Sequence, residues 1–183
     1  MFDWLWKKAP PPDPPSTDRV WRDLGARDRA VVRAAADPDV VLVAFFEATA
    51  GHVRALLSPR EVLLAGEVGR LRTPRAILVV ERHPLPSENR ALLVRLAELA
   101  PGVVPLFFSA LDEPLLRTFG GERIIALLDN LGLAPDEPVE HRMVSDSLAN
   151  AREKVAARLG SGPPARARSM EEWFTRNAIG QGR

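Results

Sequence analysis

The residues best suited to chemistry in this chain are Glu81, Arg82 and His83, which follow an apolar run at 76–80. A carboxylate, a guanidinium and an imidazole side by side can transfer protons or contact a polar ligand. If 76–80 is a strand, all three lie past its carboxyl end, where doubly wound folds place ligands. The alternative is a surface turn with a local ion pair, which is favoured because neither a nucleophile nor a phosphate-binding loop stands nearby.

Two further groups of polar residues are weaker candidates for catalysis or ligand binding. Asp112 and Glu113 resemble a pair of catalytic carboxylates, but charges at the start of a helix are commoner than such pairs. His141, next to Glu140, is interpreted as a structural hydrogen-bonding group between two helices rather than as a ligand. We therefore expect no catalytic residue.

Several classes of site are excluded by what the sequence lacks. Its 183 residues contain no cysteine, which excludes disulfides, thiolate zinc sites and cysteine nucleophiles. The three histidines, His52, His83 and His141, do not stand at helical metal-ligand spacing. The serine-hydrolase motif GxSxG and the phosphate-binding loop GxxxxGKS are both absent from the sequence. We expect no metal site and no cofactor.

Charge and hydropathy restrict the kinds of partner. Lysine and arginine total 25 against 24 acidic residues, and this formal net charge of +1 gives no general attraction to nucleic acid or to acidic membranes. No apolar run approaches the roughly 20 residues that span a bilayer. Residues 1–6 lack the basic start and the apolar stretch of a secretion signal. These features favour a cytoplasmic protein that does not bind nucleic acid.

Aromatic residues mark both ends of the chain. Residues 1–8 carry Phe2, Trp4 and Trp6, and a proline-rich stretch separates them from the rest. Near the other end, a capping box formed by residues 169 and 172 predicts a short helix that contains Trp173 and Phe174. Each group either packs on its own domain or contacts a partner, and the first group also suits peripheral contact with a membrane. All five aromatic residues are candidate interaction residues.

Apolar runs alternate with amphipathic segments along most of the chain. Strands are predicted at 40–46, 61–67, 76–80 and 103–108. Helices are predicted at 18–36 with Asp18 as cap, at 49–57, and at 87–99 with Ser87 as cap. This alternation predicts an α/β fold with a small, mostly parallel, doubly wound sheet.

A helical extension is predicted after the sheet. Its helices are expected at 121–131 and at 145–159, the second capped by Ser145. We therefore expect three parts: an N-terminal segment and linker at 1–17, an α/β domain with its helical extension at 18–159, and a linker with a short aromatic helix at 160–183.

The stretch around residues 111–155 carries the most specific pattern. It reads SALDEPLLRTFG, GERIIALLDNLG, LAPDEP and VEHRMVSDSLANAREKVA in order. This order resembles SecA, the motor ATPase of the bacterial preprotein translocase, at the junction between its second nucleotide-binding domain and its helical scaffold. The ERH triplet at 81–83 also matches that family, and the resemblance extends over residues 40–155. It implies a RecA-like fold, the C-terminal half of a helicase-type motor.

The departures from the family pattern concern its nucleotide chemistry. The family's GRSGRQG, whose arginines stabilise phosphate charge, falls on residues 94–100, where one arginine remains as Arg95 and the other is replaced by Glu98. A carboxylate in place of a cation aimed at phosphate reverses the electrostatics of phosphoryl transfer. Arg95, Glu81 and Arg82 remain as weak candidates for contacts with a nucleotide.

Two hypotheses about function follow. The first is a non-catalytic protein-interaction module that resembles a truncated SecA motor domain and is linked to protein translocation. We expect a protein partner, although the sequence names neither the partner nor an oligomeric state. The alternative is a nucleotide- or small-molecule-binding enzyme on a doubly wound fold, with its pocket near Phe46, Glu81 and Ser109.

Overall fold

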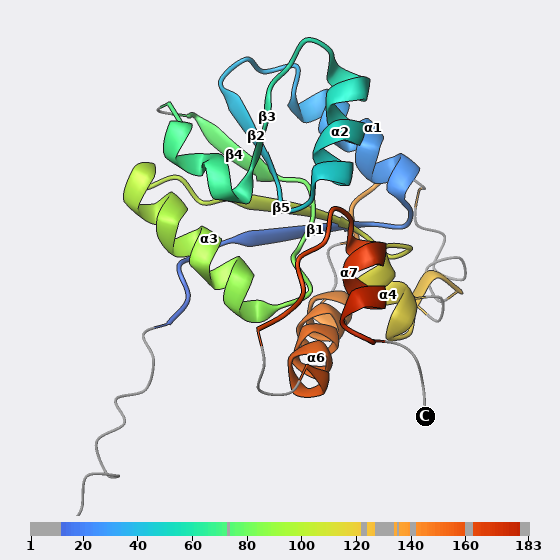
Figure 1. Cartoon of the computed structure of the whole chain (residues 1–183). Coiled ribbons are helices and arrows are strands. Elements are labelled where there is room, and N and C mark those ends of the chain that lie inside the picture. The colour runs from blue at the N-terminus through green and yellow to red at the C-terminus, as the bar shows by residue number, and fades with distance from the viewer. Residues whose placement is uncertain are drawn as a thin grey trace, which may run out of the picture.

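The computed structural model describes residues 12–72, 74–121, 124–126, 134, 136–139, 142–159 and 163–179. Within these residues, five strands form one parallel sheet in the order β1-β5-β4-β2-β3 (Figure 1). The strands are β1 (Thr17–Trp21), β2 (Val40–Ala44), β3 (Val62–Leu64), β4 (Ala76–Val79) and β5 (Leu106–Ala110). The helices are α1 (Leu24–Ala34), α2 (Glu47–Leu57), the 3-10 helix η2 (Ala65–Arg70), α3 (Pro86–Leu99), α4 (Pro114–Thr118), α6 (Arg142–Arg158) and α7 (Met170–Arg176).

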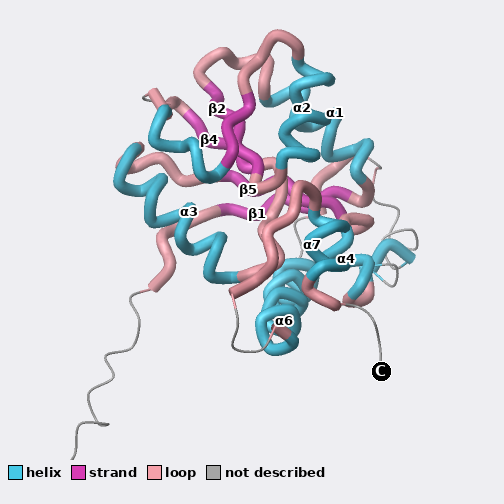
Figure 2. The backbone as a smooth tube through the Cα atoms, viewed as in Figure 1, coloured by secondary structure: helices cyan, strands magenta, loops and turns pink. Residues whose placement is uncertain are grey.

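Helices cover both faces of the sheet. On one face, α1 and α2 pack against Leu42, Leu78 and Phe108. On the other face, α3 and η2 pack against Val43 and Ile77. Successive residues of a strand point to opposite faces, so the continuous apolar runs of β2 and β4 serve both layers. Figure 2 shows the short strands in the middle, with helices around them. This arrangement confirms the predicted doubly wound α/β fold.

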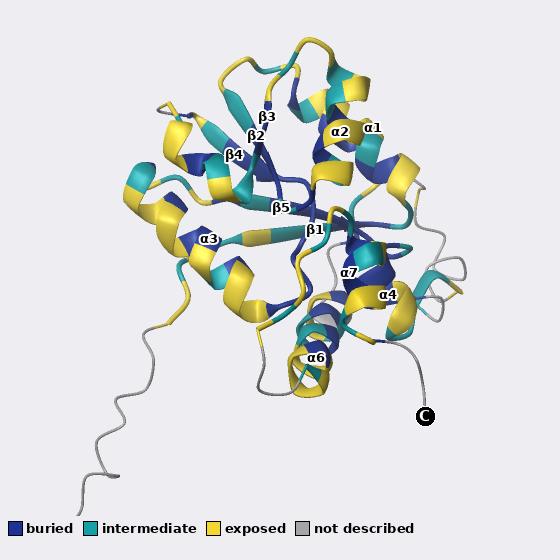
Figure 3. Cartoon of the chain, viewed as in Figure 1, coloured by how far each residue is buried: buried dark blue, intermediate teal, exposed yellow. Residues whose placement is uncertain are grey.

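A third apolar cluster lies past the carboxyl ends of the strands, where α4, α6 and α7 meet. It includes Leu111, Leu115, Leu148, Val155 and Trp173, each at most 2% exposed. Figure 3 shows buried residues on the strands and on the inner faces of these helices, and exposed residues on their outer faces. The helical extension therefore packs on the α/β part.

The segment 17–21 is a strand, so the prediction of a helix from Asp18 is wrong for its first turn. Strand β1 pairs in parallel with β5 along its whole length. That pairing and the burial of its last two residues outweigh the local helix signal, because strand propensity depends on such contacts. Helix α1 begins later, and Asp23 is its cap: the carboxylate accepts a 2.8 Å hydrogen bond from Ala26 N.

Two other elements, β3 and α3, have bounds that differ from the predicted ones. Only the first half of 61–67 is a strand, because the Glu67 carboxylate accepts a 3.0 Å hydrogen bond from Leu64 N and the chain turns into η2. Helix α3 starts at Pro86, whose fixed φ and missing N–H suit the first turn of a helix. Ser87 is therefore not its cap.

The later helices are described in part. Residues 121 and 124–126 of the helix predicted at 121–131 are helical, and Ser145 lies inside α6 rather than at its start. The aromatic residues Phe2, Trp4 and Trp6, and the pair at 140 and 141, lie outside the described residues. No helix in the described part of the chain is long and apolar enough to cross a membrane.

Candidate functional site

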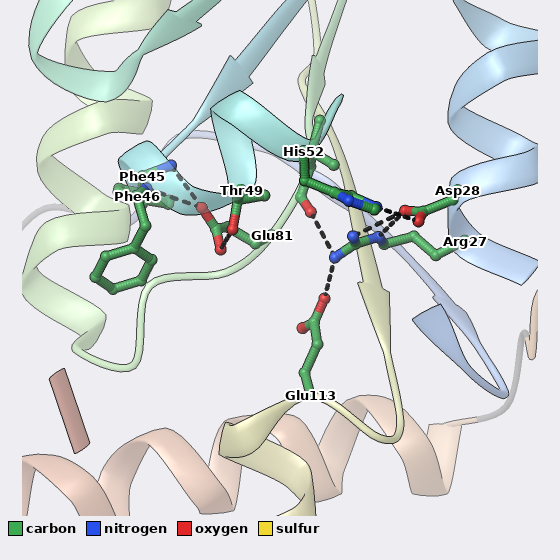
Figure 4. Close-up of polar contacts among 9 residues, drawn as sticks. Arg27, Asp28, Phe45, Phe46, Thr49, His52, Glu81 and Glu113 are labelled. Atoms are coloured by element: carbon green, nitrogen blue, oxygen red, sulfur yellow. Dashed lines mark hydrogen bonds and ion pairs between the residues drawn. The ribbon is translucent and has the colours of Figure 1, made fainter. Parts of the chain in front are cut away.

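Glu81 lies immediately past β4 and holds the start of α2. Its Oε1 accepts hydrogen bonds from the backbone N–H groups of Phe45 and Phe46, both at 2.9 Å, and Thr49 Oγ1 donates to its Oε2 at 2.7 Å (Figure 4). The carboxylate thus satisfies the N–H of Phe46, the N-cap of α2, and that of the preceding residue, and its negative charge is favourable at the start of a helix. Burial raises the pKa of Glu81. The hydrogen bonds and the charge of Arg27 favour the ionised form and oppose this rise without cancelling it.

A buried arginine lies beside Glu81 and links three elements (Figure 4). Arg27 Nη1 donates to Glu113 Oε1 at 2.7 Å and to Val80 O at 3.3 Å, and Nη2 donates to Asp28 Oδ1 at 2.9 Å. These bonds connect α1 to the end of β4 and to the start of α4. Burial raises the pKa of Glu113, while the charge of Arg27 opposes that rise. On the exposed side, Asp28 Oδ2 contacts His52 Nε2 at 2.5 Å.

Arg82 points away from Glu81, toward the edge strand β1. Its Nε donates to Asp18 Oδ1 at 2.7 Å, and its Nη2 donates to Ser16 Oγ at 3.1 Å. The guanidinium lies over the ring of Phe107, 3.4 Å from its centroid, as a cation–π contact. Arg82 is only 5% exposed, so its charge is used inside the fold.

His83 is enclosed by aromatic rings. Its ring stacks on Phe46 with centroids 5.3 Å apart, and it meets the edge of Trp173 at 5.5 Å. Its Nδ1 accepts a 3.1 Å hydrogen bond from Leu85 N, which places the proton of the neutral ring on Nε2. Burial lowers the pKa of His83 to about 4. The imidazole is therefore neutral and structural at pH 7.

The three predicted polar side chains do not converge on one point. Glu81 binds the start of α2, Arg82 binds β1, and His83 packs among aromatic rings. All three residues are at most 8% exposed, so the simple surface turn that we favoured is wrong. Arg95 lies on an exposed part of α3 and pairs at 3.2 Å with Glu98, the residue that replaces the second family arginine.

The chain's own C-terminal segment, residues 163–179, crosses the carboxyl ends of the strands. It is held there by a 2.9 Å hydrogen bond from Ala48 N to Arg168 O. Half of the predicted capping box forms at the start of α7: Ser169 Oγ accepts from Glu172 N at 3.1 Å. The Glu172 carboxylate accepts a 2.7 Å hydrogen bond from Arg168 N, the residue before the cap, rather than from the N–H of Ser169. This segment therefore occupies part of the position where doubly wound folds place ligands.

Trp173 and Phe174 are buried, at 2% and 6% exposure, in the cluster past the strand ends. Of the two arrangements considered for them, the structure shows packing on their own domain, because the Trp173 ring contacts His83 and the Phe174 ring contacts Trp173. In this conformation neither residue offers a surface to a partner, and their role in partner contacts stays a prediction.

A cavity of about 900 Å³ remains between this segment, η2 and the starts of α2 and α3, and we call it the carboxyl-end crevice. Its lining includes the aromatic rings of Phe45, Phe46, His83 and Trp173. Three carboxylates and two arginines also line it: Glu47, Glu67, Glu88, Arg166 and Arg168. Ser109, which the small-molecule hypothesis placed in this pocket, is 1% exposed and belongs to the interior of β5.

Sequence reasoning missed Arg27 and Thr49. Both stand in amphipathic helical patterns, where a polar residue usually faces solvent. The spacing of Arg27 could have indicated its burial. It lies three and four residues before Ala30 and Val31, and therefore on the same buried face of α1. Glu113 was noted only as a charge at the start of a helix.

Comparison with curated proteins agrees with the family resemblance. A segment of 82 residues, 45% of this chain, is 37% identical to protein translocase subunit SecA of Alkaliphilus oremlandii and 38% identical to that of Acinetobacter baumannii. Over 92 residues, 50% of this chain, the identity to SecA of Caldicellulosiruptor saccharolyticus is 34%. Half of this chain is homologous to SecA. The matched segment spans only 9–10% of the length of each relative, and no family model matches the chain.

The homology and the fold are consistent with each other. An all-parallel sheet with helices on both faces is the architecture expected of a RecA-like motor domain in SecA. The matched half of the chain corresponds to a short part of those relatives. Within that fragment, the ERH triplet serves to join β4 to α2, β1 and the aromatic cluster.

Proposed function

We propose that this chain is a non-catalytic protein-interaction module, derived from the second nucleotide-binding domain of SecA and acting in protein translocation. The observation that carries the proposal is the C-terminal segment, which crosses the carboxyl ends of the strands. A motor domain must present that edge to a nucleotide or to a second domain. Here the edge is packed by Trp173 and its neighbours.

Electrostatics support the absence of ATP turnover. The sequence has no GxxxxGKS loop, so no backbone cradle and lysine are available for the β- and γ-phosphates. Arg95 is paired with Glu98 on the surface of α3. The carboxyl-end crevice is lined by three carboxylates, Glu47, Glu67 and Glu88, against two arginines, and this excess of negative charge disfavours a triphosphate.

A protein partner suits the other features of the chain. Its net charge of +1 gives no general attraction to nucleic acid. The relatives are named as subunits of a protein translocase, a machine that works through protein contacts. We propose a cytoplasmic site of action with at most peripheral membrane contact, and the aromatic residues Phe2, Trp4 and Trp6 as contacts for the partner.

Calorimetric titration of the full chain with Mg-ATP and Mg-ADP tests the catalytic half of the proposal. We expect no binding heat and no phosphate release, with an intact SecA run in parallel as the positive control. Micromolar affinity together with turnover would refute the non-catalytic assignment.

Binding to purified protein translocase tests the other half. We expect the full chain to bind in a biolayer experiment, and a variant with Phe2, Trp4 and Trp6 all changed to Ser to bind more weakly. Equal binding of both proteins would remove these residues from the interface. No binding by the full chain would remove the link to translocation.

Small-molecule binding is a second candidate function, favoured by the size of the carboxyl-end crevice, about 900 Å³. Aromatic walls and a few polar groups are typical of ligand sites. A ligand found in the crevice in a co-crystal structure, displaced by the substitution Phe45→Arg, would favour this alternative.

A further inference from the structure

A second hollow, which we call the β1 hollow, lies between β1, α1 and residues 136–138. Its volume is about 340 Å³. The lining residues are Arg19, Trp21, Ala30, Arg33, Ala34, Phe108, Asp136 and Pro138. Arg19 and Trp21 stand two residues apart on an edge strand, so their side chains point to the same face of the sheet. The small side chains of Ala30 and Ala34 leave the space open.

Two buried donors in this hollow lack partners in the described part of the chain. Trp21 is 2% exposed, and its indole Nε1 is buried without a hydrogen bond. The Nε of Arg19 is also buried without one. A buried donor without an acceptor is costly, and native proteins rarely leave one unsatisfied. Both donors therefore indicate that an acceptor binds in the hollow.

The charges of the lining favour an anion as that acceptor. Asp136 is already paired, because Arg29 donates to it from Nε at 2.8 Å and also from Nη2. Within the described residues neither Arg19 nor Arg33 has an ion pair within 4 Å, although Arg33 is near enough to Asp136 to interact with it electrostatically. A water molecule can accept the indole proton, but it has no negative charge to attract the two guanidinium groups. An oxyanion does both, and guanidinium groups match the two oxygens of a carboxylate or a phosphate.

We propose that the β1 hollow binds a single oxyanion, a carboxylate or a phosphate group, between Arg19, Arg33 and the indole N–H of Trp21. The hollow has room for a phosphate group or an acidic side chain between these three donors. The β1 hollow is separate from the carboxyl-end crevice, so this proposal does not depend on the proposed function.

Titration of the ¹⁵N-labelled 183-residue chain tests the proposal, with the indole N–H cross-peak of Trp21 as the readout. The variant Trp21→Phe assigns that peak. The probes are inorganic phosphate and a capped acidic hexapeptide, at constant ionic strength set with chloride. We expect at least one probe to move the peak with saturation. The tighter probe shows whether the oxyanion comes from a free ion or from an acidic protein segment.

The variants Arg19→Gln and Arg33→Gln each remove one guanidinium, and we expect each to weaken binding about tenfold or more. Arg33 is exposed on α1, so its variant folds even if the change at Arg19 disturbs β1. The control Arg75→Gln removes the same charge from a site outside the hollow, and we expect it to leave the affinity unchanged. A peak that neither probe moves, or a response that survives the loss of Arg33, would overturn the proposal.

Discussion

Acid should destabilise this protein through His83, and the structure sets the size of the effect. In the folded chain the ring is enclosed by Phe46 and Trp173, and Nδ1 accepts the hydrogen bond from Leu85 N. Protonation places a second N–H on the ring at Nδ1, facing the N–H of Leu85, and it buries a charge. Burial therefore lowers the pKa of His83 from 6.5 to about 4.

The lowered pKa of His83 decides how the free energy of unfolding changes with pH. Between pH 6.5 and 4 the unfolded chain binds the proton more readily than the folded chain, so the free energy of unfolding decreases as the pH falls. With the two pKa values above, the loss is about 2 kcal/mol at pH 5 and about 3 kcal/mol at pH 4. Above pH 6.5 this contribution to stability is fully present.

Two buried carboxylates act in the opposite direction. Burial raises the pKa of Glu81 and of Glu113, so the folded chain takes up their protons first and acid stabilises it through them. A matched variant separates these effects. His83→Asn does not titrate, and its Oδ1 can take the place of Nδ1 as acceptor for the N–H of Leu85. Loss of the ring lowers its stability by a similar amount at every pH.

Urea unfolding at pH 7.5 and pH 5, followed by far-ultraviolet circular dichroism, measures the difference. Between these two values, the native protein should lose about 2 kcal/mol more than His83→Asn does. Equal losses in both proteins would show that the imidazole is not held neutral by its surroundings, and the reasoning from burial and from the Nδ1 hydrogen bond would be refuted.

Three further substitutions test the packing around the site. Arg27→Gln leaves Glu113 buried without its cation and should lower the free energy of unfolding by about 3–5 kcal/mol at pH 9.5, where the native carboxyl group is ionised. The loss should be smaller at pH 6, where burial, which raises the pKa of Glu113 to about 8, keeps that group protonated; an equal loss at both values would contradict the pairing. Trp173→Ala removes the ring that fixes the C-terminal segment, so trypsin should cleave the variant near residues 166–168 faster than the native chain, and an unchanged rate would contradict the docking. Gly121→Ala places a Cβ 2.4 Å from the backbone oxygen of Leu111 and should cost about 1–3 kcal/mol by thermal unfolding, whereas Gly51→Ala, with no atom within 4 Å, should not destabilise the chain.

Much of the fold can be predicted from local pattern. The apolar runs at 40–46 and 76–80 contain β2 and β4, and the amphipathic pattern at 87–99 matches α3 to within a residue. The capping box ahead of Trp173 correctly located α7. These elements are specified by spacing within a few residues, which a single sequence displays directly.

The site was less accessible to such reasoning. The sequence placed Glu81, Arg82 and His83 correctly past the end of a strand, but it could not show that their side chains separate to three different partners. Arg27 and Glu113 are 86 residues apart, and nothing local to either one indicates the other. Their pairing depends on α1 and the end of β5 being brought together.

The sequence by itself determined the alternation of strands and helices, the relationship to SecA and the lack of a phosphate-binding loop, because each of these is a property of residue type and spacing. The tertiary structure alone decided that 17–21 is an edge strand beside β5 and that the C-terminal segment covers the strand ends. Both results depend on contacts between distant segments, whose free energy appears only when the sheet order β1-β5-β4-β2-β3 brings them together.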